Sequence, residues 1–87
     1  MYRIKYHKSV LRFLSKHKDL HKQFFDKTEV LRKNPFDVSL DVTSLKWREK
    51  WAYRLRIWKY RFKFLVISDE VVVFFYEAWA RWDIYKK

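Results

Sequence analysis

Two short runs of alternating residues, 52–57 and 59–64, constrain the fold of this chain more than any other feature of its sequence. Successive side chains of a β-strand point to opposite faces, so a period of two indicates a strand. Arg54 and Arg56 therefore share one face of the first run, with apolar and aromatic residues on the other face. Because only Trp58 lies between the runs, we expect them to pair as a tight antiparallel hairpin with one cationic and one apolar face.

The cationic face of this hairpin indicates an anionic partner. Like charges that are packed together repel one another, so such a cluster usually faces an anion, and a phosphodiester backbone is the first candidate. For any single residue of the segment a solvated surface position is the simpler interpretation, whereas Arg54, Arg56 and Arg61 together favour binding. The basic residues from 46 to 63 are Lys46, Arg48, Lys50, Arg54, Arg56, Lys59, Arg61 and Lys63.

The composition favours one folded domain, residues 1–87, with a polyanionic partner. Hydrophobic residues make up 49% of the chain and the net charge is +11, which argues against disorder and favours nucleic acid, an acidic protein or an anionic surface. The absence of cysteine, of an N-terminal apolar run and of a membrane-length apolar stretch fits a cytoplasmic protein that does not bind membranes. Since the chain has no glycine, we expect Asn, Asp or longer connections wherever a turn needs a positive φ.

The rest of the sequence predicts an α+β fold. Residues 2–6 alternate as a first strand, Ser9 is a candidate cap for a first helix, and Asp19 is a candidate cap for a second helix that ends before Pro35. Residues 71–76 are apolar on both faces, as in a central strand. This order predicts a two-helix hairpin packed on a twisted antiparallel sheet of about four strands.

The segment from 36 to 43 shows no clear element in the sequence. Its apolar residues Phe36, Val38, Leu40 and Val42 are spaced so that they could reach the core from an irregular segment.

Few other residues offer chemistry. Arg81 and Tyr85 could bind a phosphate and stack on a base, or they could simply pair with Asp83 and pack at an edge. His17 and His21 have a spacing that suits a metal on one helix, but a helix start at Asp19 between them argues against a metal site. The carboxylates are too few and scattered for a metal-dependent nuclease, and Glu49 and Glu77 are the nearest candidate bases.

The pattern resembles the RelE/ParE superfamily of type II toxins. The matching segments keep the order of the family and cover nearly the whole chain. They are 6–10 (YHKSV), 34–37 (NPFD), 45–46 (LK), 53–56 (YRLR), 60–61 (YR), 69–73 (DEVVV) and 81–86 (RWDIYK). The resemblance implies the RelE-like, microbial-RNase-like fold of two helices on a twisted antiparallel sheet.

The resemblance to the RelE type also implies an activity. Such proteins enter the ribosomal A site and cleave mRNA without a metal or small-molecule cofactor, by attack of a 2′-hydroxyl that leaves a 2′,3′-cyclic phosphate. An acidic cognate antitoxin silences them. The implied catalytic residues are Arg54, Arg56, Arg61, Arg81 and Tyr85. Basic residues that we expect to contact RNA or the ribosome are Lys46, Arg48, Lys50, Lys59, Lys63 and Lys86.

The sequence departs from the family pattern in ways that keep an alternative open. Arginine at positions 54 and 56 replaces the lysines of some relatives and cannot readily give or take a proton. Ala80 stands where histidine is frequent, and Trp47 and Trp58 stand where glycines are expected. A ParE-like inhibitor that binds DNA gyrase is therefore the alternative to an mRNA endonuclease, and the tryptophans in place of glycines leave a degenerate, non-toxic homologue as a third hypothesis.

Overall fold

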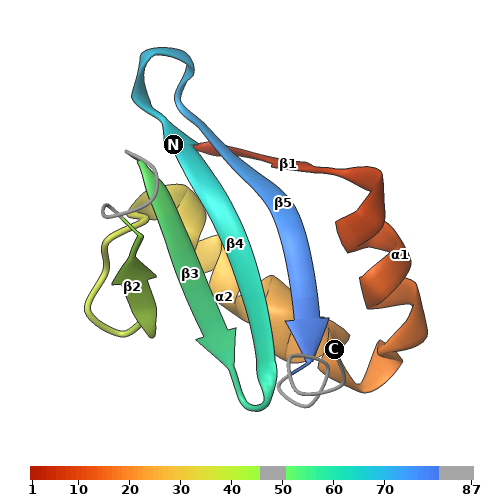
Figure 1. Cartoon of the computed structure of the whole chain (residues 1–87). Coiled ribbons are helices and arrows are strands. Elements are labelled where there is room, and N and C mark those ends of the chain that lie inside the picture. The colour runs from red at the N-terminus through yellow and green to blue at the C-terminus, as the bar shows by residue number, and fades with distance from the viewer. Residues whose placement is uncertain (46–50, 81–87) are drawn as a thin grey trace.

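The computed structural model describes residues 1–45 and 51–80 and shows two helices packed against a five-stranded sheet (Figure 1). This arrangement confirms the predicted α+β class. Neither α1 nor α2 has the length and apolar character that crossing a membrane requires. The elements are β1 (Arg3–Tyr6), α1 (Lys8–Lys16), η1 (Lys18–Leu20), α2 (His21–Lys33), β2 (Val42–Ser44), β3 (Ala52–Ile57), β4 (Tyr60–Ile67), η2 (Ser68–Glu70) and β5 (Val72–Ala80).

The sheet is mixed, which corrects the prediction of about four antiparallel strands. Its strand order is β1-β5-β4-β3-β2, and β1 runs parallel to β5, with Arg3 opposite Val72. The other neighbouring strands are antiparallel. The two helices carry the chain from one edge of the sheet, β1, to the other edge, β2 (Figure 1). The parallel pair joins segments far apart in the sequence, so no local sequence pattern predicts this pairing.

The core lies between α2 and the sheet and is built largely from aromatic rings. Phe24 of α2 is fully buried, with its ring centroid 4.7 Å from that of Phe62 and 5.3 Å from that of Phe75. Leu20 and Leu31 are also fully buried. The apolar face predicted for the β3–β4 hairpin supplies the opposite wall, since Leu55 pairs with Phe62 and both are buried.

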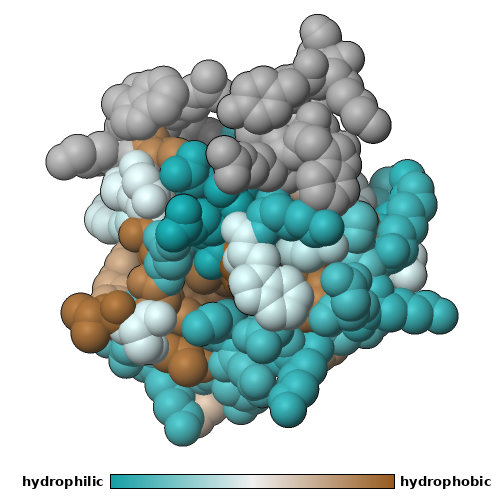
Figure 2. Space-filling view, turned by 90° about the horizontal axis from the view of Figure 1, so that it is seen from below, coloured by the Kyte–Doolittle hydropathy of each residue, from teal (hydrophilic) through white to brown (hydrophobic). Residues whose placement is uncertain are grey.

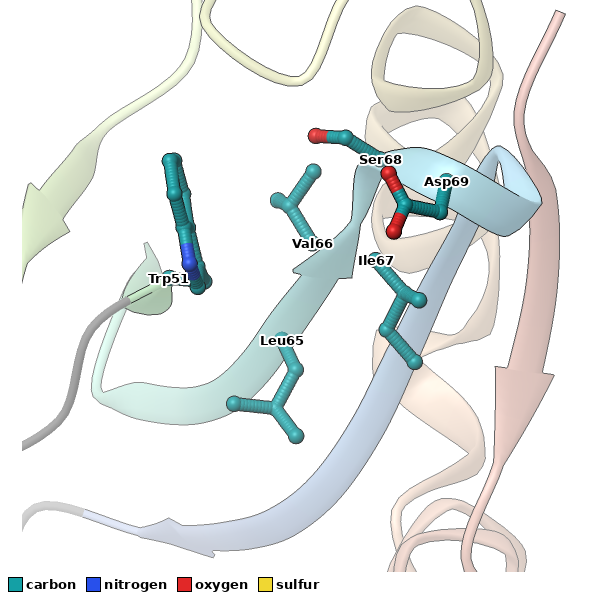
Figure 3. Close-up of a pocket in the computed structure, with 6 residues that line it drawn as sticks. All are labelled: Trp51, Leu65, Val66, Ile67, Ser68 and Asp69. Carbon is teal, nitrogen blue, oxygen red and sulfur yellow. The ribbon is translucent and has the colours of Figure 1, made fainter.

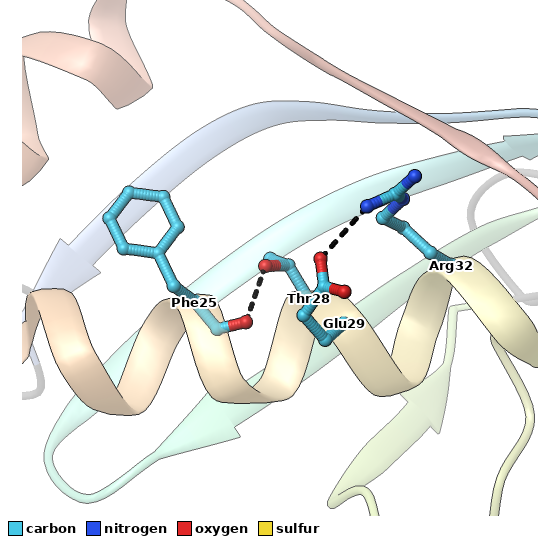
Figure 4. A network of polar contacts seen from close by, with 4 residues as sticks. All are labelled: Phe25, Thr28, Glu29 and Arg32. Carbon is cyan, nitrogen blue, oxygen red and sulfur yellow. Dashed lines mark hydrogen bonds and ion pairs between the residues drawn. The ribbon is translucent and has the colours of Figure 1, made fainter.

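A threonine completes the buried face of α2 without leaving a polar group unsatisfied. Thr28 is buried, and its hydroxyl donates a hydrogen bond of 2.9 Å to the carbonyl oxygen of Phe25 one turn earlier (Figure 4). A buried hydroxyl without a partner would cost free energy, so this bond lets threonine take a core position. Glu29 and Arg32 form an ion pair of 2.9 Å on the same helix.

The helix starts differ from those predicted. His7, not Ser9, caps α1, because its ring nitrogen accepts a hydrogen bond from the backbone N–H of Ser9. Asp19 lies in η1, and α2 begins at His21 without a side-chain cap. The Nε2 atom of His21 instead lies 2.6 Å from the carbonyl oxygen of Leu14. The two helices are thus joined by a side chain that bonds the end of α1.

The segment before β2 is more ordered and more exposed than its apolar spacing predicts. Leu40 is buried, but Phe36 is 50% and Val38 is 100% exposed. Side chains hold two successive turns here: Asn34 accepts from the Phe36 N–H and Asp37 accepts from the Ser39 N–H. These turns replace the extended backbone that would bring alternate side chains inward.

The glycine-free chain uses large residues at its left-handed backbone positions, which corrects the expectation of Asn, Asp or longer connections. Trp51, Trp58 and Val71 have φ values of 67°, 56° and 54°. Val71 follows η2 and leads into β5. A Cβ atom makes this conformation costly, and a β-branched residue is an outlier there. The fold therefore carries backbone strain at three turns.

Replacing Val71 with glycine is expected to stabilise the fold by about 1 kcal/mol, because glycine adopts a positive φ without a steric cost. Thermal unfolding should show a rise in Tm of about 4–8 °C. Val38→Gly is the matched control, since Val38 is fully exposed and has no positive φ. The control should not raise Tm. A lower Tm for Val71→Gly than for wild type would show that the backbone at Val71 is not strained.

Candidate functional site

The register of the β3–β4 hairpin brings four cations together on one face of the sheet. Arg54 lies opposite Lys63, and Arg56 lies opposite Arg61. Their neighbours Leu55 and Phe62 point to the core, so the cations lie on the face turned away from it. This confirms the predicted separation of a cationic from an apolar face. We call Arg54, Arg56, Arg61 and Lys63 the cationic face.

The hairpin turn is one residue longer than predicted, which removes Lys59 from this face. β3 ends at Ile57 and β4 begins at Tyr60, so Trp58 and Lys59 form the turn. The Nζ atom of Lys59 lies 5.4 Å from the centre of the Tyr60 ring. The end of the molecule that carries this turn is covered mostly by hydrophilic residues (Figure 2).

Main-chain and side-chain acceptors orient two of the arginines. The Nη1 atom of Arg61 donates to the carbonyl oxygens of Trp58, at 2.9 Å, and of Tyr60, at 3.2 Å. The Nε atom of Arg56 lies 2.5 Å from the carboxylate of Asp41. The sequence reasoning missed Asp41, because it precedes β2 in a segment whose pairing with β3 is not evident locally. Both guanidinium groups are held at the surface, where an anion can reach them.

Strand β5 adds a carboxylate and an aromatic ring to the cationic face. Glu77 lies opposite Lys63, and their charged groups are 3.2 Å apart. The Nζ atom of Lys63 also lies 5.3 Å from the centre of the Trp79 ring. Trp79 was not predicted for this site, although its place opposite Arg61 follows from the strand register. In the described part of the chain the face therefore combines positive charge with the carboxylates of Asp41 and Glu77 and with the Trp79 ring.

Two donors at this face lack an acceptor. The Nε atom of Arg54 and the Nε1 atom of Trp79 are buried and make no hydrogen bond in the described part of the chain. A buried donor without an acceptor costs free energy. A phosphate oxygen is the kind of acceptor that a guanidinium binds best.

Several predicted site residues lie outside the described residues, so their predicted roles stay untested. They are Lys46, Arg48, Glu49, Lys50, Arg81, Tyr85 and Lys86.

His17 packs between α1 and the β3–β4 hairpin. The His17 ring lies 4.3 Å from that of Phe13, and the Tyr60 hydroxyl donates to Asp19 at 3.5 Å. Burial raises the pKa of Tyr60, and the Asp19 carboxylate raises it further, so the phenol stays protonated as a donor. Residues 1–45 and 51–80 contain no group of three or more His, Asp or Glu side chains that could hold a metal.

A pocket of about 480 Å³ lies at the other end of the β3–β4 hairpin. Trp51 forms one wall and stands across from Leu65 and Val66 of β4 (Figure 3). Ile67, Ser68 and Asp69 complete the lining. These residues carry no positive charge, so the pocket does not suit a phosphate, and the cationic face is the stronger candidate for binding a polyanion.

Comparison with known proteins finds likeness in structure but not in sequence. No family model and no curated protein sequence matches the chain. A chain of the archaeal RelE–RelB complex from Pyrococcus horikoshii OT3 superposes with a TM-score of 0.80 and 27% identity, covering 92% of this chain and 94% of that one. A chain of the RelB–RelE antitoxin–toxin complex from Methanococcus jannaschii gives a TM-score of 0.75 and 22% identity, covering 94% and 95%.

These two structures confirm the fold over nearly the full length of the described chain. The architecture of two helices on a five-stranded sheet is therefore one that this chain shares with a chain of a RelE–RelB complex.

Proposed function

We propose that this chain is the toxin of a type II toxin–antitoxin system and acts as an endoribonuclease on mRNA in the ribosome. The observation that carries the proposal is the meeting of Arg54, Arg56 and Arg61 on the face of the sheet that points away from the core. The likeness at 27% identity to a chain from a complex of RelE with RelB supports it.

The proposed reaction suits a site built from arginines. The 2′-oxygen of one nucleotide bonds to the adjacent phosphorus, the bond to the 5′-oxygen breaks, and a 2′,3′-cyclic phosphate and a 5′-hydroxyl result. Negative charge builds on the phosphate oxygens during this displacement. Guanidinium groups stay protonated at any working pH and can bind two oxygens at once, so they stabilise that charge.

Each proposed catalytic residue has a separate role. Arg61 holds the scissile phosphate, and Arg54 and Arg56 stabilise the charge that develops on it. Arg81 and Tyr85, which lie outside the described residues, are proposed as a further phosphate ligand and as the group that orients a base or moves a proton. The reaction uses neither a metal ion nor a small-molecule cofactor.

Glu77 is the carboxylate that the described face offers as an acceptor for the 2′-hydroxyl proton. It projects from β5 opposite Lys63, on the same side of the sheet as Arg61. Its ion pair with Lys63 keeps the carboxylate at this face.

The partners follow from the charge of +11. The ribosome and mRNA present phosphates to the cationic face, and the proposed ribosome contacts also use Lys46, Arg48, Lys50, Lys59, Lys63 and Lys86. An acidic antitoxin, disordered until it binds, would lay carboxylates over the same cations. We place this encounter in the cytoplasm.

Toeprinting on translating ribosomes tests the proposal. The wild-type protein should produce new message ends at the ribosomal A site, because the cationic face can then stabilise cleavage of the phosphate presented there. Message without ribosomes is the control and should stay intact, and the new 3′ ends should carry a cyclic phosphate.

Intact message on ribosomes, from a preparation that stops growth when expressed, would overturn the proposal. Loss of DNA supercoiling by gyrase under the same conditions would establish the ParE-like alternative instead.

A further inference from the structure

Trp58 has a left-handed backbone conformation, which costs free energy for any residue that has a Cβ atom. It is the first residue of the two-residue β3–β4 turn, with a φ of 56°. Hairpin turns with a positive φ at this position favour glycine. The Trp58 side chain is nevertheless 59% exposed, so burial in the core explains little of its presence.

The same turn ties Trp58 to the cationic face. The carbonyl oxygen of Trp58 accepts the hydrogen bond of 2.9 Å from Arg61 Nη1. Arg56 lies opposite Arg61 on the adjacent strand. An exposed indole and two guanidinium groups thus occupy one end of the hairpin, at an end of the molecule whose surface is mostly hydrophilic (Figure 2).

We propose that Trp58 is a stacking platform for a base of the RNA strand whose phosphate Arg61 binds; this inference rests on the proposed function. A single RNA strand offers a base next to each phosphate, and proteins bind such strands with aromatic rings beside cations. Stacking accepts any base, so Trp58 would add affinity and position the strand with little sequence preference.

The two other residues with a left-handed backbone, Trp51 and Val71, lie away from the cationic face. Trp51 is also exposed, but it borders the uncharged pocket at the opposite end of the hairpin (Figure 3). Val71 follows η2, before β5. Of the three, only Trp58 lies at the turn that holds Arg61.

The test compares Trp58→Gly, Trp58→Phe and Val71→Gly in the full chain. Binding of a labelled single-stranded oligoribonucleotide is measured by fluorescence anisotropy, and Tm is measured on the same samples. Trp58→Gly should bind RNA roughly 5- to 150-fold more weakly, the loss expected for one stacked base. Its Tm should rise, because glycine relieves the left-handed backbone while the carbonyl that accepts from Arg61 stays in place.

The other two variants separate stacking from backbone effects. Trp58→Phe keeps an aromatic ring and should bind within a few-fold of wild type. Val71→Gly relieves the same kind of strain away from the cationic face and should raise Tm without changing RNA affinity.

Equal RNA affinity of Trp58→Gly and wild type would overturn the stacking role. So would a wild-type protein that fails to bind the oligoribonucleotide; if that preparation still cleaves message on ribosomes, the proposed function survives and only the role of Trp58 fails. If Trp58→Gly loses binding to an antitoxin but keeps the RNA affinity of wild type, Trp58 makes a protein contact and the proposal is likewise overturned.

Discussion

Replacing Arg61 with alanine is expected to slow cleavage of ribosome-bound mRNA about 100- to 1000-fold, the effect of removing one preorganised donor to a transition-state oxyanion. In free energy this is roughly 2.7–4 kcal/mol of lost transition-state stabilisation. The Arg61 guanidinium is well placed for this role, because two main-chain carbonyls of the hairpin turn hold it. Single-turnover cleavage on programmed ribosomes measures the change.

Arg12→Ala is the matched control, since it removes the same charge from an exposed position on α1. It should cleave at nearly the wild-type rate. Loss of the Arg61 hydrogen bonds should lower the free energy of unfolding by about 1.5–3 kcal/mol, which is less than the roughly 5–15 kcal/mol of a small domain. The Arg61→Ala protein is therefore expected to fold and to cleave slowly. A wild-type rate for Arg61→Ala would show that the active site lies elsewhere.

Replacing Phe24 with alanine is expected to remove most of the stability of the fold. The Phe24 ring is fully buried against Phe62 and Phe75. Truncating such a ring leaves a cavity and costs about 3–5 kcal/mol, which is a large part of the roughly 5–15 kcal/mol that holds a small domain together. Urea unfolding should show a much lower midpoint for Phe24→Ala.

The neighbouring residue provides the control for this prediction. Phe25 is 50% exposed, so Phe25→Ala should cost less than half as much as Phe24→Ala. Equal losses for the two variants would mean that α2 does not pack on the sheet through the Phe24 side.

The parts of the fold that depend on local patterns could be predicted from the sequence. The period of two in the β3–β4 hairpin places Arg54 and Arg56 on one face and Leu55 on the other, and the strand pairing confirms it. The parallel pairing of β1 with β5 and the edge strand β2 depend on contacts between distant segments. No local periodicity in the sequence indicates either of them. Strand β1 was predicted but its parallel pairing was not, and the unpredicted strand β2 makes the sheet one strand wider than predicted.

The candidate site could be predicted only in part for the same reason. The cations come from adjacent strands, whereas Asp41, Glu77 and Trp79 join them through pairing with other strands. The three left-handed turns were missed because a Trp or Val in the sequence carries no signal for a positive φ. That conformation is imposed by the closure of the turns, which overrides the preference of the residue.

The pairing of β1 with β5 also sets the order in which a newly made chain can fold. Arg3 finds its partner Val72 only after about 70 further residues have been added, which takes roughly 4–14 s at 5–20 residues per second. Until then the first strand has no partner in the sheet, although the residues of α1 and α2 have already been made. The cell that makes this protein therefore has an interval of several seconds, within each round of synthesis, before the complete sheet exists.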